Sequence, residues 1–496
     1  MLARLDLSRL VTAIVLLSTL AMAVRVPLSP DTWWHLRCGQ VQWQARDVIR
    51  VDLFSHTAAG TPWINQSWLP QLIMYGLFAA GGFPALALAV GGLVALTMWF
   101  TLRTAPSQGR YGYLWRAFVL LWAAISTGRV WAARPHLITF LFTAVWIYIL
   151  NRYRQAERPR LLWWLPPLML LWANSHGGYI IGFLLLGAEI GGLFLDRIAQ
   201  ERGFALDRLL APPIKQLLLL LPLCLVAALL NPQGIRLVIF PFQTLRSAAQ
   251  QNFVAEWASP DFHQPDLLPF LVLLLVTWSV LILARKQIDG AAWLRLLGFT
   301  FMALRSGRYL GLCAIAIAPL LVRYGPQAVA WWHTRVSPST YPAPPRRGSP
   351  LLNWILLLLV LVGVGVKVSQ PLHPAIIAEA QASVFPVSAV EYMRNHDLPP
   401  TLFNEYAWGG YLIWHLWPQT PVFIDGRADP YGDELIMAYR QTIMALPGWE
   451  TVLEAYDVHT VLIAPQTALA AAMVQDPAWR AVYTDDLAVI FVRAAP

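Results

Sequence analysis

The chain has 496 residues, of which 57% are hydrophobic and 13% charged, and its formal net charge is +9 at pH 7. A water-soluble globule could not bury that much apolar surface, whereas a lipid bilayer can surround it. The basic residues form short groups between apolar runs and no continuous basic face, which argues against nucleic acid as a partner. The composition therefore predicts an integral membrane protein.

The N-terminus has two interpretations. Arg4 and Arg9 precede an apolar stretch from Leu10 to Val24, and the residues from Ala21 to Ala23 resemble a signal-peptidase site. We favour a retained membrane helix with a cytoplasmic N-terminus, because the sidedness of the later loops requires it. The three cysteines are widely separated, and two lie inside apolar segments, so they predict neither a disulfide nor a cysteine metal site.

Eleven apolar runs are long enough to cross a hydrocarbon core of about 30 Å. They lie near residues 8–26, 84–103, 112–129, 136–151, 159–174, 177–195, 214–230, 266–284, 290–304, 307–324 and 351–368. One further run, 67–81, could also cross, and this would reverse the side of every later loop. The number of crossings therefore depends on how this run lies.

The distribution of arginine decides between the two topologies. If 67–81 lies along the outer surface, the arginine groups, such as the four between residues 152 and 160, face the cytoplasm. This reading predicts a plasma (inner) membrane protein with a transmembrane domain over 1–368 and a first external loop with surface helices over 25–82. The water-soluble domain over 369–496 is then extracytoplasmic.

Two titratable side chains, Asp31 and His35, stand just beyond the first span in the motif PDTWWHLRCGQ. A partly desolvated aspartate beside Trp33 and Trp34 should have a raised pKa and could act as general base on an acceptor hydroxyl or amine. Alternatively, Asp31 caps a helix over 32–47 while the tryptophans anchor it at the headgroups. The two roles are compatible, and we assign Asp31 and His35 as candidate catalytic residues.

Three turns on the same predicted face, GRVWAARPH, WANSHGG and RSGRY, contain polar groups that bind phosphate or move protons. The candidate residues for binding the donor phosphate or the acceptor are Arg134, His136, Asn174, His176, Arg305 and Arg308. The spacing of Arg305 and Arg308 predicts one helical face. The alternatives are helix ends and turns for the first two motifs, and snorkelling to headgroups for the arginines.

No metal site is assigned, and the need for a divalent metal is left open. Glu256, Asp261 and His263 lie close in sequence, but their spacing fits no tight ligand motif.

The C-terminal segment alternates short β-like runs with helical ones, which predicts an α/β domain closing in a hairpin turned at Asp485 and Asp486. Asp425 and Arg427 follow a predicted strand over 421–425, where α/β sheets commonly place ligand sites. They are candidate site residues, and an internal salt bridge that fixes the loop is the alternative.

The early Asp31, the following WLPQLIMYGLF segment and the RPH, WANSHGG and RSGRY turns resemble the GT-C superfamily of polytopic glycosyltransferases. The resemblance covers most of the membrane region and is strongest to bacterial relatives of the protein mannosyltransferase and lipid A aminoarabinose transferase group. Asp31 is followed by Thr32, where the mannosyltransferase pattern has an Asp-Glu pair.

The resemblance implies a GT-C-like α-helical membrane bundle and an inverting transfer of sugar from a polyprenyl-phosphate donor. Asp31 would take the proton of a glycan, lipid or protein acceptor, and Arg305 or Arg308 would hold the departing phosphate. A transporter or lipid flippase is an alternative, although Glu189 is the one charge we place inside a span and no paired halves are seen. A catalytically inactive scaffold is a third reading.

Overall fold

The structure is a computed structural model that describes residues 5–494 except 106–111, 156–157, 202–211, 254, 285–287 and 337–348. Part of the arginine pattern behind the predicted topology lies outside these residues, namely Arg4, Arg110, Arg202, Arg208, Arg285, Lys286, Arg346 and Arg347.

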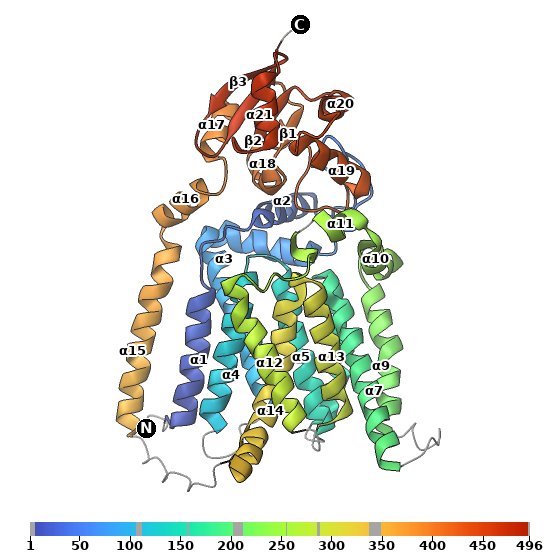
Figure 1. Cartoon of the computed structure of the whole chain (residues 1–496), viewed down its shortest axis with the longest axis vertical. Helices are drawn as coiled ribbons and strands as arrows, with labels where there is room; N and C mark the ends of the chain where they lie inside the picture. Colours follow the sequence, from blue (N-terminus) through green and yellow to red (C-terminus); the bar gives the residue numbers. More distant parts are fainter. Residues whose placement is uncertain are drawn as a thin grey trace.

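The molecule has three layers along its longest axis (Figure 1). A bundle of roughly parallel helices forms one end, and a domain with a small sheet forms the other. Between them, α2 (Pro30–Ala45) and the first part of α3 (Trp68–Thr104) lie across the end of the bundle. The lower end of α1 and the C-terminal strands are therefore at opposite ends of the molecule.

Helices occupy all eleven apolar runs, as expected where the backbone must satisfy its own hydrogen bonds. They are α1 (Leu7–Ala23), the second part of α3, α4 (Gly112–Thr127), α5 (His136–Arg154), α6 (Leu165–Ala173), α7 (Ile180–Glu201), α9 (Pro212–Leu229), α12 (Leu268–Leu283), α13 (Gly290–Arg305), α14 (Leu310–Val336) and α15 (Pro350–Ser369).

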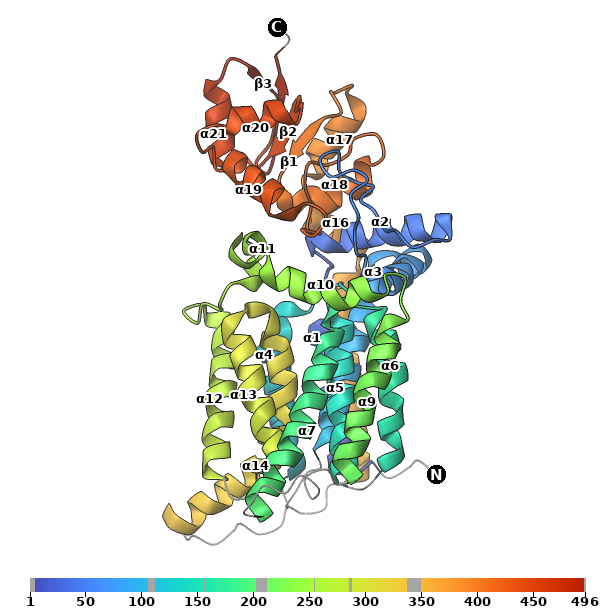
Figure 2. The same ribbon diagram turned by 90° about the vertical axis from the view of Figure 1, so that its right-hand side faces the viewer.

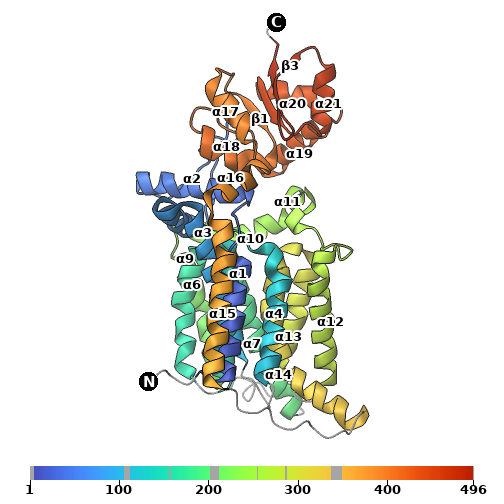
Figure 3. The ribbon, with the colours of Figure 1, turned by 90° about the vertical axis from the view of Figure 1, so that its left-hand side faces the viewer.

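Six helical segments in the described part of the chain are long and apolar enough to cross a membrane: Trp68–Thr104, Gly177–Gln200, Pro212–Leu229, Pro265–Leu283, Gly307–Trp331 and Pro350–Leu372. Leu7–Ala23 is a shorter apolar helix. These helices make the chain a multi-pass membrane protein, while the count of eleven crossings stays a prediction. α15 stands at the left edge of the bundle in Figure 1 and in front of α1 in Figure 3. Its Leu351, Leu358 and Leu359 are more than half exposed, as suits a lipid-facing helix.

The ambiguous run 67–81 ends at a break in α3. Gly81 and Gly82 leave the helical conformation, and Gly82 has φ +61°, which only glycine adopts at low cost. The part of α3 before this break lies across the bundle, and the part after it, beginning near Pro84, runs along the bundle (Figure 1). The glycine pair therefore allows one continuous stretch of helix to change direction.

Short helices connect these elements near the ends of the bundle. They are η1 (Gly128–Val130), η2 (Pro159–Trp164), η3 (Gly177–Tyr179), η4 (Ala255–Trp257), η5 (Pro265–Leu267), η7 (Gly307–Tyr309) and η8 (Gln370–Leu372). Two further helices, α10 (Ile235–Arg246) and α11 (Ala248–Phe253), lead from the bundle towards the sheet domain (Figure 2).

The C-terminal domain contains a four-stranded sheet in the order β1-β2-β4-β3. β1 (Leu402–Asn404) is parallel to β2 (Thr460–Ile463), while β3 (Trp479–Thr484) and β4 (Val489–Arg493) form the predicted hairpin. Asp485 accepts hydrogen bonds from the backbone N–H groups of Leu487 and Ala488 in its turn. The other elements are α16 (Pro374–Ala382), α17 (Val387–Asn395), η9 (Tyr406–Trp408), α18 (Gly409–Leu416), α19 (Gly432–Ile443), α20 (Trp449–Ala455) and α21 (Ala468–Gln475).

The predicted strand over 421–425 is wrong, because this segment does not join the sheet. Val422 instead forms an isolated parallel bridge with Ser55 of the first loop. The His56 N–H donates to the Val422 carbonyl over 3.0 Å, and the Val422 N–H donates to the Phe54 carbonyl over 3.1 Å. The first loop thus supplies the backbone partner that a neighbouring strand would otherwise provide.

Candidate functional site

Asp31 lies in the first turn of α2, at the end of the bundle that faces the C-terminal domain. The helix begins at Pro30 with Ser29 as N-cap, so the alternative in which Asp31 caps a helix starting at residue 32 is wrong. The Asp31 carboxylate accepts a hydrogen bond from Trp34 Nε1 over 3.0 Å. The Thr32 hydroxyl donates to the Ala133 carbonyl over 3.0 Å, which holds α2 against the turn before α5.

Arg134 joins two carboxylates that are far apart in the sequence. Its Nη2 lies 2.8 Å from Asp31 Oδ2, and its Nη1 forms an ion pair with Glu256 Oε1 in η4. The Arg134 side chain is 24% exposed and that of Asp31 is 14% exposed, so their contact is mostly shielded from solvent, whereas the Glu256 side chain is 45% exposed. The structure therefore brings the first loop, the RPH turn and the EWASPDFH segment to one point.

The two carboxyl groups in this cluster differ in pKa. Burial raises the pKa of Asp31 above its ordinary value, although Arg134 and Trp34 oppose the shift. Burial would also raise the pKa of Glu256, but the charges of Arg134 and Arg308 outweigh it and lower that pKa to about 2. Glu256 is thus a fixed anion, whereas Asp31 is the carboxylate better suited to accept a proton.

The predicted shared helical face of Arg305 and Arg308 is wrong. α13 ends at Arg305, the following Ser306 is extended, and Arg308 belongs to η7. Ser306 donates to the Glu256 carbonyl over 2.9 Å, and the Gly307 N–H donates to the Ala258 carbonyl over 2.9 Å. These bonds fix the RSGRY turn beside Glu256, while Arg305 itself is exposed.

Arg308 is a cation of this site without a carboxylate partner among the described residues. Its guanidinium lies over the Trp257 ring, 5.1 Å from the centroid. Its charge contributes to lowering the pKa values of Glu256 and His176, which places it within electrostatic range of both. Of the two predicted arginines, Arg308 is therefore the one available to hold an anion at the site.

The three candidate histidines surround this cluster as neutral groups or hydrogen-bond partners. Thr139 Oγ1 and the Gly178 N–H donate to His176 Nδ1, over 2.9 Å and 3.0 Å, which leaves the ring proton on Nε2. His136 Nε2 donates to the Val130 carbonyl over 2.7 Å. His35 contacts Gln71 and packs on Trp34, and burial lowers the pKa values of His35 and His176 well below the ordinary value.

Asn174 lies at the same end of the bundle, but its amide is used within the protein. Trp68 Nε1 donates to its Oδ1 over 3.0 Å, and its Nδ2 donates to the carbonyls of Leu170 and Leu230, each over 2.9 Å. Because both ends of the amide are engaged, Asn174 joins the transverse part of α3 to the bundle and supports the turn that carries His176.

The C-terminal domain closes over Asp31 through glycines. A Cβ atom on Gly426 would lie 2.1 Å from Asp31 Oδ1, and one on Gly410 would lie 2.5 Å from the Pro30 carbonyl oxygen. Both distances are too short for any side chain, so the close approach of α18 and the DGR segment to α2 requires glycine. The wall of the site that faces Asp31 is therefore backbone of the C-terminal domain.

Gly426→Ala should destabilise the docked C-terminal domain by about 1–3 kcal/mol, because its methyl group overlaps the Asp31 carboxylate. The measurement is the thermal unfolding of the purified protein in detergent. Gly363→Ala on α15 is the matched control, since nothing lies within 4 Å of a Cβ there. Equal unfolding temperatures for the two variants would contradict the tight packing at Gly426.

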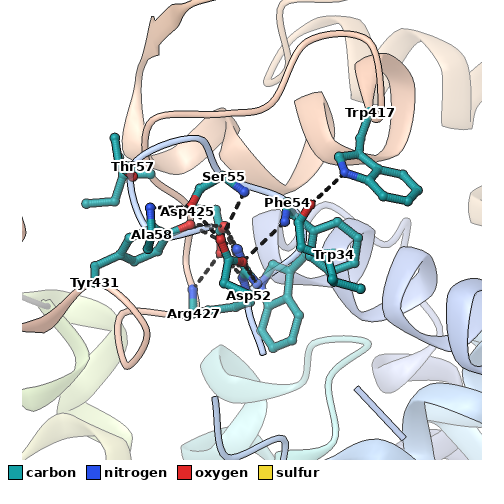
Figure 4. A network of polar contacts seen from close by, with 12 residues as sticks. Trp34, Asp52, Phe54, Ser55, Thr57, Ala58, Trp417, Asp425, Arg427 and Tyr431 are labelled. Carbon is teal, nitrogen blue, oxygen red and sulfur yellow. Dashed lines mark hydrogen bonds and ion pairs between the residues drawn. The ribbon is translucent and has the colours of Figure 1, made fainter. Parts of the chain in front are cut away.

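Asp425 and Arg427 form the predicted internal salt bridge, with a third partner from the first loop (Figure 4). Arg427 donates to Asp425 Oδ1 through Nε over 2.8 Å and to Oδ2 through Nη2 over 2.6 Å, and its Nη1 lies 2.5 Å from Asp52 Oδ1. All three side chains are fully buried, and Phe54 and Trp63 lie against the guanidinium. Through Asp52, the Asp425–Arg427 pair therefore holds the first loop against the C-terminal domain.

A second contact joins the C-terminal domain to α11. Ser247 and the Ala248 N–H donate to the Asp433 carboxylate, and Gln250 Nε2 donates to Asp429 Oδ1 over 3.1 Å. Burial raises the pKa of Asp429 to about 6, although Gln250 and Arg308 oppose the shift. The domain is thus held from both sides of the site.

The residues around Asp31 do not fit a resident divalent metal ion. Among the described residues, no group of three or more His, Cys, Asp or Glu side chains is placed to hold a metal. Asp31 and Glu256 share the Arg134 cation, and His263 pairs with Asp261 at a fully exposed position, apart from the buried cluster. The described residues therefore do not bring Glu256, Asp261 and His263 together as a set of metal ligands.

Sequence reasoning did not identify Asp52, Gly426 or Asp429 as parts of this region, and it did not pair Glu256 with Arg134. The Gly-rich segment FIDGRADPYG was a signal for the last part of the site, whereas Asp52 had no local motif at all. Its partner is 375 positions away, the difference between 427 and 52, and only the fold reveals it.

No protein-family model matches the chain, and no curated protein matches it in sequence. Among solved structures, it is similar to the archaeal oligosaccharyltransferase AglB from Archaeoglobus fulgidus in complex with an inhibitory peptide and a dolichol-phosphate. The TM-score is 0.52 at 12% identity, over 91% of this chain and 69% of that chain. The A. fulgidus enzyme tethered to an acceptor peptide containing the NVT sequon gives a TM-score of 0.52 at 14% identity, over 97% and 74%. At such identities the likeness shows the fold.

Proposed function

Because this chain shares the GT-C fold of those oligosaccharyltransferases, we propose that it is a membrane glycosyltransferase that uses a lipid-linked sugar donor. Its donor is a sugar on a polyprenyl phosphate, and its acceptor is a glycan, lipid or protein group with a free hydroxyl or amine. Transfer occurs with inversion at the anomeric carbon, at the bundle end that faces the C-terminal domain.

The proposal rests on one observation: a candidate base and a cation without an ion-pair partner among the described residues lie at that end of the bundle. Asp31 is a shielded carboxylate with a raised pKa, held in place by Arg134 and Trp34. Arg308 stands on the neighbouring turn with no ion-pair partner among the described residues. A transfer from a phosphate leaving group needs one base, one anion-binding cation and positioning of the two substrates.

The proposed step is a single displacement at the anomeric carbon. The acceptor oxygen or nitrogen forms a bond to this carbon as the bond to the phosphate oxygen breaks. Asp31 takes the proton of the acceptor, and the electron pair of the broken bond leaves with the polyprenyl phosphate, whose charge Arg308 stabilises. His176, neutral with its proton on Nε2, is a hydrogen-bond donor for the same phosphate or for the sugar.

We propose that the reaction takes place at the extracytoplasmic face of the plasma membrane. This assignment rests on eleven crossings, a cytoplasmic N-terminus and the excess of arginine in the loops away from the C-terminal domain. In this topology, α2 and the first part of α3 lie at the outer membrane surface, where a lipid-linked donor presents its headgroup. Arg134, His136 and Asn174 then act by holding the reacting groups in place.

Arg308→Ala should lower the turnover rate with a polyprenyl-phosphate sugar by about 10²–10³-fold, because a fixed cation at a leaving phosphate stabilises mainly the transition state. The measurement is transfer of radiolabelled sugar by the full-length protein in lipid vesicles. Arg305→Ala is the matched control, since Arg305 is exposed three residues earlier and should leave the rate nearly unchanged. Equal losses in both variants would contradict the role given to Arg308.

A transporter or flippase is less well supported by the charges in the bundle. Glu189 of α7, the charge that favoured such a protein, lies with its Oε1 2.7 Å from Arg154 Nε. Arg154 also pairs with Asp196 and Asp289, each at 3.2 Å. This cluster joins α5, α7 and the start of α13 as a structural contact in which Glu189, Asp196 and Asp289 each have an ion-pair partner.

A further inference from the structure

The cation that contacts Asp31 directly is an arginine side chain of the protein itself. Arg134 lies between Asp31 and Glu256, two carboxylates from segments that are brought together only by the fold. Two facing acids near a reacting phosphate commonly hold a divalent ion. Here the place between them is filled by a guanidinium.

We propose that Arg134 replaces a divalent metal ion in this site and that sugar transfer by this protein is independent of metal. This inference deepens the proposed function, on which its activity readout rests, while its binding readout requires no transfer. Arg134 acts through Asp31 and Glu256 and is therefore a positioning residue.

The donor atoms support this assignment. Asp31 Oδ1 accepts from Trp34, Asp31 Oδ2 pairs with Arg134, and Glu256 Oε1 pairs with the other terminal nitrogen of the same guanidinium. A magnesium or manganese ion needs about six oxygen ligands, and zinc needs about four ligands of any kind. No third acid, histidine or cysteine completes such a set among the described residues.

The charge of Arg134 is also permanent. Burial would lower its pKa, but Asp31 and Glu256 outweigh this effect and raise the pKa above its ordinary value. A guanidinium therefore remains protonated at every pH at which the protein is folded, and no chelator can remove it. Its planar geometry orients the Asp31 carboxylate through one nitrogen while the other holds Glu256.

The segments that carry the two carboxylates, Asp31 and Glu256, are also each held in place by a separate hydrogen bond. The Thr32 hydroxyl holds α2 to the Ala133 carbonyl, next to Arg134 in the sequence. Ser306 holds the backbone of Glu256. A metal ion draws its ligands together by itself, whereas a guanidinium bridge needs both carboxylates to be held at the correct distance by other contacts.

The test is a Mn²⁺ titration of the full-length protein in detergent after treatment with EDTA, followed by the electron paramagnetic resonance signal of free Mn²⁺. The wild-type protein should show no saturable site. Arg134→Met should gain one weak Mn²⁺ site per chain, because Asp31 and Glu256 then face each other without a cation and bound water can complete the ligand set. Arg129→Met, which removes an exposed partner of Asp266 in the same turn, is the matched control and should gain none.

One saturable Mn²⁺ site in the wild-type protein that is lost in Glu256→Gln would overturn the proposal, and this result does not depend on how Arg134→Met folds. Loss of wild-type transfer in EDTA with recovery in Mn²⁺ would overturn it as well. If no transfer is seen under any condition, the proposed function fails, but the Mn²⁺ titration still decides whether Arg134 occupies a metal position.

Discussion

Asp31→Asn should lower the rate of sugar transfer by about 10²–10⁴-fold, the usual contribution of a general base. The amide keeps the size of the side chain and can still accept the Trp34 hydrogen bond, but it cannot take the acceptor proton. The measurement is single-turnover transfer with a saturating lipid-linked donor, so that weaker binding does not mimic slower chemistry. Full transfer activity in this variant would remove the assignment of Asp31 as the general base.

The pH dependence gives a second view of the same group. Burial raises the pKa of Asp31, so kcat/KM should fall as the pH is lowered through that raised value and the carboxylate becomes protonated. Glu256, with a pKa of about 2, stays ionised over this range and cannot cause the fall. Asp429 has a pKa of about 6 and could, so Asp429→Asn is the control variant and should retain the acid limb.

Arg427→Met should destabilise the docked C-terminal domain by about 3–5 kcal/mol, because it leaves Asp52 and Asp425 buried without a cation. The variant should unfold at lower temperature and expose the 369–496 region to limited proteolysis. Sugar transfer should fall too, since Gly426, next to Arg427, forms the wall beside Asp31.

Two comparisons separate the buried network from a general effect of losing an arginine. Arg493→Met removes a half-exposed ion pair with Glu454 at 3.4 Å, which is worth about 0–1 kcal/mol. The triple variant Asp52→Asn, Asp425→Asn, Arg427→Met removes the buried charges together and should recover part of the lost stability. An Arg427→Met protein that unfolds like the Arg493→Met protein would contradict the proposed lock.

The membrane bundle and its site loops could be predicted because their signals are local. Apolar runs predict helices in lipid, and the GT-C fold expected from Asp31 and the three turns is confirmed by the structural likeness. The narrower resemblance to the mannosyltransferase and aminoarabinose transferase group stays a prediction, as do the roles of the candidate residues. The C-terminal hairpin was also visible, because a strand, turn and strand lie next to each other in the sequence.

What the sequence did not predict has one physical cause: the residues concerned contact partners that are far away in the sequence. The segment over 421–425 has the composition of a strand, but its backbone partner is the first loop and not the sheet. Arg305 and Arg308 have helical spacing, but Ser306 bonds to Glu256 and ends the helix between them. The two carboxylates that pair with Arg134 could not be foreseen either, because the fold alone brings Asp31 and Glu256 to it.

The bridge between the first loop and Val422 also sets an order of assembly. Leu53 and its partner Trp417 are 364 residues apart, so the loop emerges long before the segment that pairs with it. Since chains fold from the N-terminus as they are made, Asp52 must remain without Arg427 until nearly the whole protein has been inserted. A nascent or prematurely terminated chain has the Asp31 carboxylate but lacks the Gly426 wall, so the last stretch to be synthesised completes the site.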